Sequence, residues 1–217
     1  MIEKLQNQLR FLPAISPAEQ QTVVCIEAGH IYTDETPSLS HEIGAIVGHN
    51  VSQILEGMGV TVQKMLFVDD YNALSHNLNV EEYRSLLNSH GFEPDILVME
   101  SSLVQDAYQV IAELEVNSLT ETNKNGALIL KKNHKKEKDI VLRKSPSMES
   151  LPACAALDTA LYIKKNERAG ICVTVLHEKW KSQQEAVKKV LKALGKDIPI
   201  LEIFFTDYGE IEIDFDY

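Results

Sequence analysis

Three histidines are the first residues whose type and spacing could bind a metal. His30 follows a predicted strand, and His41 and His49 lie in a segment with helical spacing of apolar residues. The eight residues from His41 to His49 rotate a helix by about 80° beyond whole turns, so these side chains do not share a face as ligands at i and i+4 do. We therefore predict that the chain has no metal site.

The three cysteines favour neither a zinc site nor a disulfide framework. Cys25, Cys154 and Cys172 are odd in number, far apart in the sequence and flanked by apolar residues. This pattern is typical of reduced, buried thiols in a reducing compartment. We expect three buried thiols and a cytoplasmic protein.

A basic cluster is the third chemical candidate. Its members lie between the apolar segments 127–130 and 140–142, and they are Lys131, Lys132, His134, Lys135, Lys136 and Lys138. Such a cluster could hold an RNA phosphate or an acidic partner, but charge runs are usually solvated, and we favour a hairpin tip. The chain has 21 Lys and Arg against 32 Asp and Glu, a net charge of −11, which disfavours broad nucleic-acid binding.

The elements that would position these residues alternate between strands and helices. Strands are predicted over residues 22–27, 60–68, 95–99, 171–176 and 201–206. Helices are predicted over residues 43–58, 79–87, 103–114, 152–165 and 182–194. This alternation implies parallel strands joined by crossover helices, an α/β fold with a doubly wound sheet. Such a sheet binds ligands at the carboxyl ends of its strands, where the chain topology switches direction.

The length of 217 residues and a hydrophobic fraction of 44% favour one domain over residues 1–217 with a modest insertion. We expect an N-terminal helix and loop over 1–21, a basic hairpin insertion over 124–145, and an acidic C-terminal strand over 207–217, where acidic and apolar residues alternate. No apolar stretch approaches the ~20 residues that cross a bilayer. The N-terminus also lacks the apolar core of a secretory signal, so we expect no membrane association.

A series of short motifs begins at the end of the first predicted strand and continues through the following predicted helix and strand. The motifs are Glu27-Ala28-Gly29-His30, Pro37-Ser38-Leu39-Ser40-His41, Ile46-Val47-Gly48, Ile54-Leu55-Glu56-Gly57-Met58-Gly59 and Phe67-Val68-Asp69-Asp70. Together with weaker matches that extend to about residue 201, this series resembles the catalytic domain of arginyl-tRNA synthetases. The resemblance implies the Rossmann-like, doubly wound parallel sheet of a class I aminoacyl-tRNA synthetase core with a small β-hairpin insertion.

The resemblance also implies a nucleotide site. In the family, a His-x-Gly-His motif at a helix N-terminus stabilises the charge that develops on the α-phosphate of ATP. The corresponding residues here are 38–41, and a Gly-rich adenosine segment of the family corresponds to the residues after His177. ATP or AMP would then contact Ser38, Ser40, His41 and His177, with His41 as the catalytic residue. The alternatives are that both serines only cap the helix and that His41 has no ligand.

A substrate site is implied as well. In the family, a Tyr and an Asp four residues apart on one helix face the amino acid. Cys154 and Asp158 occupy these positions, and we expect Glu27 to line the same pocket. A carboxylate there would bind a small cationic amino acid or amine by a charge-assisted pair. The alternative for Asp158 is a solvated carboxylate on a helix face.

Several departures from the family pattern fall on its chemistry. Ser38 replaces the first histidine, Ser40 replaces the glycine, and Glu35 stands where family members often carry a lysine. We also expect no counterpart of the family's later mobile lysine loop. Trp180, next to the former adenosine segment, would either fill that pocket or stack on a ligand.

These departures predict a paralogue that lacks tRNA-binding domains and does not charge tRNA. We expect it to bind a small cationic amino acid, an amine or a nucleotide, and a protein partner is compatible with this role. Synthetase activity is not expected. The alternative is an ATP-dependent, adenylate-forming ligase that acts on an amino acid or small amine without tRNA, in which His41 works with Lys179 or Lys181.

Overall fold

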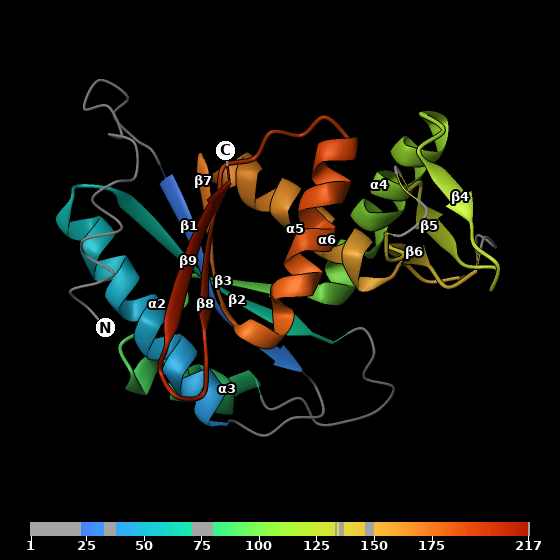
Figure 1. The fold of residues 1–217 in the computed structure, drawn as a ribbon. Helices are drawn as coiled ribbons and strands as arrows, with labels where there is room; N and C mark the ends of the chain where they lie inside the picture. Colours follow the sequence, from blue (N-terminus) through green and yellow to red (C-terminus); the bar gives the residue numbers. More distant parts are fainter. Residues whose placement is uncertain are drawn as a thin grey trace. The chain divides into compact units, whose positions relative to one another are not determined.

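Figure 1 shows the protein as a computed structural model, in which residues 23–32, 38–70, 80–132, 134, 137–145 and 150–216 are described. The N-terminal helix and loop expected over 1–21 lie outside these residues, as do Glu35 and Asn79, the first residue of the helix predicted over 79–87. The chain forms two compact units. The first comprises Met1–Ser101, Lys165–Trp180 and Ile198–Tyr217, and the second comprises Ser102–Lys164 and Lys181–Asp197.

The first unit is built on a six-stranded sheet with the order β3-β2-β1-β7-β8-β9. The strands are β1 Val23–Tyr32, β2 Thr61–Asp69, β3 Ile96–Met99, β7 Ile171–His177, β8 Ile200–Phe205 and β9 Ile211–Asp216. All neighbours pair in parallel except β9, which runs antiparallel to β8. The predicted parallel α/β sheet is confirmed. Its chain order reverses between β1 and β7, which places the topological switch point there.

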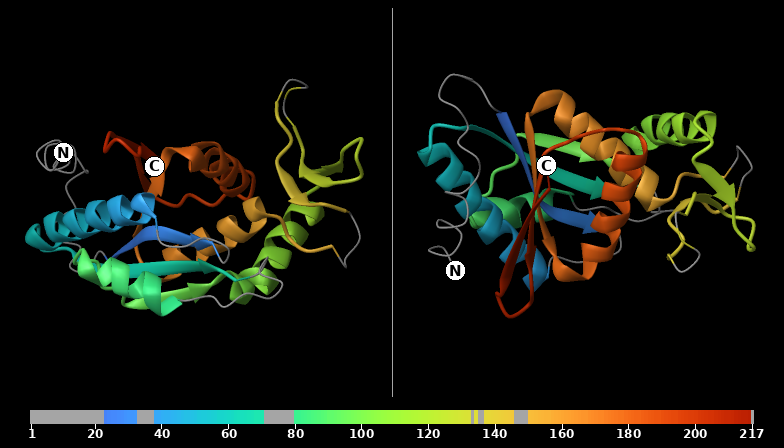
Figure 2. Two further views of the ribbon diagram at one scale, coloured as in Figure 1. Left: turned by 90° about the horizontal axis from the view of Figure 1, so that it is seen from below. Right: turned by 45° about the horizontal axis from the view of Figure 1, so that its top comes forward.

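Helix α2 Leu39–Gly57 runs along the sheet beside β1, as the views in Figure 2 show. Its buried side chains, which include Val47, Val51 and Leu55, recur at helical spacing and face the core under the strands. The shorter helix α3 Val80–Ser89 packs against α2 and buries Tyr83 and Leu87. Gly91 follows this helix with a positive φ of 82°, a conformation that favours glycine at a helix C-terminus.

The second unit contains α4 Val104–Val116, most of α5 Cys154–Arg168, and α6 Lys181–Ala193. Its three-stranded antiparallel sheet has the order β4-β5-β6, formed by β4 Thr120–Thr122, β5 Leu128–Leu130 and β6 Val141–Arg143. The predicted basic hairpin is therefore confirmed as the β5–β6 connection. β4 was not predicted, because Thr-Glu-Thr has no apolar residue to mark a strand.

Three sequence-based expectations need correction. Glu27 was expected near the end of its strand, but β1 continues to Tyr32 by pairing with β2 beyond a bulge, so Glu27 lies in mid-strand. Cys154 is exposed, whereas Cys25 and Cys172 are buried as expected. The C-terminal strand begins at Ile211 rather than 207, because Thr206 and Gly209 form the turn that precedes it.

Two short 3-10 helices complete the elements of the described residues, η1 Glu100–Leu103 and η2 Glu178–Trp180. Across the described residues, every helix is too short or too polar to cross a bilayer.

The contact between α2 and β1 generates a prediction about stability. A Cβ atom added at Gly48 would lie 2.3 Å from Cβ of Ala28 and 3.1 Å from the Phe92 ring, and both of these residues are fully buried. We expect Gly48→Ala to lower the free energy of unfolding by about 1–3 kcal/mol through overpacking. Urea denaturation followed by circular dichroism measures the change.

Gly57→Ala is the matched control in the same helix. Nothing lies within 4 Å of a Cβ atom at Gly57. Alanine there should leave stability unchanged or raise it by up to about 1 kcal/mol, because it only removes the entropic penalty of a helical glycine. Equal effects of the two substitutions would contradict the close approach of α2 to β1.

Candidate functional site

Ser38, Ser40 and His41 form a polar cluster at the start of α2. Ser38 has an extended backbone, with φ −128° and ψ 167°, and immediately precedes the helix. Its Oγ lies 2.9 Å from Oγ of Ser40 and 2.7 Å from Nδ1 of His41, and its backbone N–H donates to the same Nδ1 at 3.2 Å. These three predicted site residues therefore lie together.

The contacts at His41 determine where its ring proton lies. Since Nδ1 accepts from the backbone N–H of Ser38, the proton of the neutral imidazole is on Nε2. The Ser38 hydroxyl then donates to Nδ1, and the Ser40 hydroxyl donates to Ser38. The ring also packs edge-on against Tyr83, with 5.0 Å between centroids. His41 thus stabilises the first turn of its own helix, which is a structural role that needs no ligand.

His177 ends β7, the parallel neighbour of β1, so both strands finish at the same edge of the sheet. Its Nδ1 accepts from the backbone N–H of Lys179 at 3.2 Å, and its Nε2 lies 3.3 Å from Oδ1 of Asp207. Its ring packs edge-on against Phe205. This histidine therefore connects the end of β7 to the turn that follows β8.

The residues after His177 bring an aromatic ring and a cation to the same edge. Nζ of Lys179 lies 5.6 Å from the centroid of the Trp180 ring, within the range of a cation–π interaction. Trp180 is half-buried and Lys179 is exposed. The two readings of Trp180, filling a former pocket or stacking on a ligand, both remain predictions.

Glu27 is buried and forms an ion pair with Lys165 of α5. Nζ of Lys165 also donates to Oγ1 of Thr174 on β7, at 3.4 Å. Burial by itself would lower the pKa of Lys165, but the Glu27 carboxylate together with the nearby Cys25 and Cys172 raises it, and the net direction is upward. Glu27 was expected to line the pocket of a cationic substrate, but its charge is already paired with that of Lys165.

Sequence reasoning treated Lys165 only as the end of a predicted helix. The sequence around Glu27 did indicate that this carboxylate needs a buried partner, since it is flanked in β1 by the buried Ile26 and Ala28. A carboxylate inside an apolar strand requires a buried donor or cation.

Two thiols share this face of the sheet. Cys25 and Cys172 are opposite each other in the β1–β7 register, two positions before the pair of Glu27 and Thr174. Burial raises the pKa of both thiols, that of Cys172 to about 12. They are therefore protonated at neutral pH and unsuited to nucleophilic chemistry.

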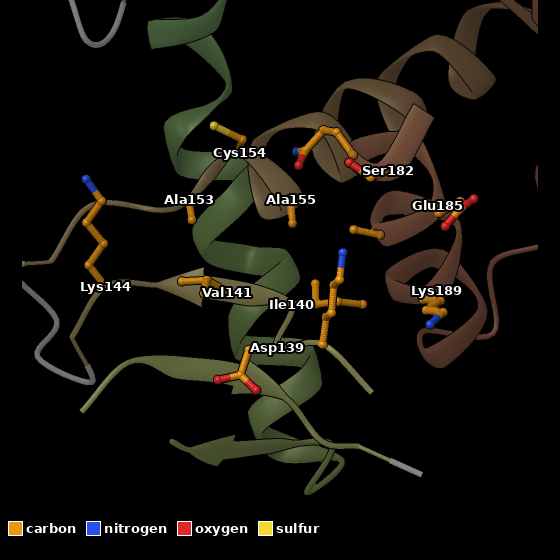
Figure 3. Close-up of a pocket in the computed structure, with 13 residues that line it drawn as sticks. Asp139, Ile140, Val141, Lys144, Ala153, Cys154, Ala155, Ser182, Glu185 and Lys189 are labelled. Atoms are coloured by element: carbon orange, nitrogen blue, oxygen red, sulfur yellow. The ribbon is translucent and has the colours of Figure 1, made fainter. Parts of the chain in front are cut away.

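Cys154 and Asp158 lie one turn apart on α5, in the part that belongs to the second unit. Asp158 is only 7% exposed, and its Oδ2 accepts from Nε2 of Gln183 on α6 at 2.9 Å. The alternative of a solvated carboxylate is thus wrong for Asp158. Cys154 lines a cavity of about 660 Å³ within the second unit, where Figure 3 shows it at the start of α5.

A metal site receives no support from the geometry. Within the part of the chain that the structure describes, no group of three or more His, Cys, Asp and Glu side chains is arranged to hold a metal ion.

Comparison with known proteins finds similarity at the level of structure. No protein-family model and no curated protein sequence matches the chain. The arginyl-tRNA synthetase of Thermus thermophilus is similar with a TM-score of 0.66 and 14% identity, over 95% of this chain and 52% of that one. The arginyl-tRNA synthetase of Plasmodium falciparum is similar with a TM-score of 0.65 and 12% identity, over 88% of this chain and 44% of that one.

A synthetase for another amino acid is also similar. The tryptophanyl-tRNA synthetase of Plasmodium falciparum gives a TM-score of 0.53 at 12% identity, over 94% of this chain and 60% of that one. The chain thus spans roughly half the length of these synthetases. Its fold is that of a class I aminoacyl-tRNA synthetase catalytic core.

The buried ion pair generates the second prediction. Lys165→Met should lower the free energy of unfolding by about 3–5 kcal/mol, because it leaves the buried Glu27 carboxylate without its cation. Lys164→Met is the matched control, since Lys164 pairs with Asp106 at the surface, and it should change stability by less than about 1 kcal/mol. Chemical denaturation of both variants makes the comparison.

A double variant tests the same pair through pH. Glu27→Leu combined with Lys165→Met should recover most of the lost stability, because two apolar side chains replace two buried charges. Since the folded-state pKa of Lys165 is raised above 10.5, its contribution is complete below that pH and is lost as the pH rises through the folded-state value. The wild type should therefore lose stability above pH 10.5 more steeply than the double variant, and parallel curves would contradict the pairing.

Proposed function

We propose that the protein binds a small molecule, an amino acid, an amine or a nucleotide, and does not charge tRNA. The observation that carries the proposal is the cluster of Ser38, Ser40 and His41 at the N-terminus of α2, following β1, the strand beside the switch point of the sheet. In doubly wound sheets this is the place where ligands bind. A nucleotide phosphate would meet hydroxyls and the helix N-terminus there.

Binding without catalysis is favoured by how the polar groups of this unit are already used. Nδ1 of His41 accepts from Ser38, His177 has contacts at both ring nitrogens, and Glu27 is paired with Lys165. Activation of an amino acid by ATP needs fixed positive charge at the phosphates in the transition state. A net charge of −11 also disfavours the contacts to RNA phosphates that tRNA charging requires.

Recognition of an amine is assigned in this proposal to Asp158, in the second unit. Oδ2 of this carboxylate accepts a hydrogen bond from Nε2 of Gln183 on α6, which holds it in place. An ammonium or guanidinium group of a ligand would form a charge-assisted pair with it.

The second candidate function is an adenylate-forming ligase that works without tRNA. It is favoured by one feature of His41, whose Nδ1 contact leaves the ring proton on Nε2 as a potential donor to a phosphate. Lys179 or Lys181, which follow the end of β7, would then supply the positive charge.

An exchange assay distinguishes these two functions. We expect arginine-dependent exchange of pyrophosphate into ATP to be undetectable. AMP should raise the thermal midpoint of the wild type, because a ligand that binds only the native state stabilises it. Ser40→Ala should reduce this shift, whereas Ser89→Ala, at an exposed serine that ends α3, should not.

Robust exchange would instead establish the ligase. In that case Lys179→Ala and Lys181→Ala would identify the lysine that contacts the phosphates.

The amine site has its own test. We expect Asp158→Asn to weaken the binding of arginine or agmatine by about tenfold or more, because it removes the negative partner of a desolvated charge pair. Asp106→Asn, at an exposed carboxylate of α4 in the same unit, is the matched control and should leave the affinity unchanged. Calorimetric titration measures both, and an unaffected Asp158→Asn variant would remove Asp158 from the site.

A further inference from the structure

The second unit contains a cavity next to the proposed amine site, since Gln183, which donates to Asp158, is one of its lining residues. It has a volume of about 660 Å³, within the range of pockets that hold small organic ligands. Figure 3 shows its walls, with Asp139, Ile140, Val141 and Lys144 on the side of the hairpin, Ala153, Cys154 and Ala155 at the start of α5, and Ser182, Glu185 and Lys189 on α6. Every lining residue belongs to the second unit.

The charges that line the cavity are predominantly positive. Lys138, Lys144 and Lys189 contribute three ammonium groups, and Asp139 and Glu185 contribute two carboxylates. One of these carboxylates, that of Asp139, is already compensated outside the lining by an ion pair with Lys132 and a hydrogen bond from Asn123. The lining therefore carries three lysines against Glu185 and the already paired Asp139, in a chain whose net charge is −11.

The titration of Asp139 agrees with this compensation. Hydrogen bonds from Lys132 and Asn123 lower the pKa of its carboxyl group. The carboxylate of Asp139 therefore pairs with residues of the hairpin and is not a binding group for a cationic ligand in the cavity.

The start of α5 adds to the positive potential. Its first backbone N–H groups have no carbonyl partner within the helix, because Ala156 and Leu157 are the first residues to donate back, both to the carbonyl of Ala153. The lining side chains at this end, those of residues 153–155, are small. A helix N-terminus next to three lysines favours an anion.

The rest of the wall is apolar, with Ile140, Val141 and Ala186 among the lining residues. A ligand that fills the cavity would need an apolar body as well as a charged group.

We propose that this cavity binds a small organic anion, a phosphate or carboxylate group on a compact apolar body. The site is made by the second unit alone and gives the basic hairpin a function, since Lys138 and Lys144 flank β6 at the base of that hairpin. It differs from the proposed function in the ligand charge and in the residues that recognise it, because the proposed function requires nucleotide contacts in the first unit and an amine at Asp158, which adjoins the cavity through Gln183.

Three probes with the same aromatic body and different charges test the proposal on the full chain by calorimetric titration. They are phenyl phosphate, phenylacetate and benzylamine. We expect at least one of the two anions to bind and benzylamine to bind at least about tenfold more weakly, because like charges repel in a partly enclosed cavity. Binding of only phenyl phosphate, or of only phenylacetate, would identify the charged group.

A triple variant, Lys138→Gln with Lys144→Gln and Lys189→Gln, should weaken binding of the anion by about tenfold or more. The charge-matched control is Lys124→Gln with Lys131→Gln and Lys192→Gln, three exposed lysines of the same unit outside the cavity lining. It should change the affinity less than about twofold, which separates binding in the cavity from a general effect of net charge. Equal losses in the two triple variants would overturn the proposal.

Alkylation of Cys154 locates the bound anion. This thiol lines the cavity and is exposed, whereas Cys25 and Cys172 are buried. Bound phenyl phosphate should slow the reaction of Cys154 with iodoacetamide, a neutral reagent, in the wild type and in the control variant but not in the triple lysine variant. An unchanged rate in the wild type at saturating phenyl phosphate would overturn the proposal.

The outcomes for the two proposals can be told apart. If benzylamine binds better than both anions and Asp158→Asn abolishes its binding, the anion site is wrong and the amine site is supported. If the anions bind while AMP, arginine and agmatine do not, the anion site holds and the proposed function fails.

Discussion

The buried ion pair between Glu27 and Lys165 is the interaction on which the first unit depends. Both side chains lie almost completely out of water, Glu27 in the middle of β1 and Lys165 near the end of α5. A buried charge is tolerated only when its partner is held in good geometry and further hydrogen bonds assist. Thr174 supplies one such bond from β7, the neighbour of β1. Relative displacement of β1, β7 or the end of α5 would therefore leave a charge unpaired in the core.

This pair also limits what the first unit can bind. A carboxylate in mid-strand at position 27 was the expected partner of a cationic substrate, but the chain supplies that cation itself from Lys165. A ligand amine would have to displace a lysine whose raised pKa reflects the strength of the pairing. A small cationic molecule would therefore have to be recognised by groups at the carboxyl ends of the strands or by groups in the second unit.

A feature could be predicted from the sequence when the residues that make it lie close together along the chain. The parallel strands and crossover helices were predictable because their apolar periodicity is local, and the C-terminal alternation correctly marked β9. The pairing of Glu27 with Lys165 joins residues 138 positions apart, and no local pattern encodes it. β4 was missed although its turn is readable, since Asn123 accepts two backbone N–H groups and Gly126 has a φ of 81°.

In the candidate site, sequence spacing placed Ser38, Ser40 and His41 together, but it could not tell which ring nitrogen each histidine uses. His41 and His177 make the same choice, since each accepts a backbone N–H at Nδ1, from Ser38 and Lys179 respectively. Both neutral imidazoles therefore carry their proton on Nε2, as donors without fixed positive charge. At His177 this donor already lies 3.3 Å from Oδ1 of Asp207, so it serves a contact within the protein. Stabilising the negative charge that develops on a phosphate during the reaction requires fixed positive charge as well as hydrogen-bond donors. Neutral imidazoles supply donors without that charge, and this favours binding over catalysis here.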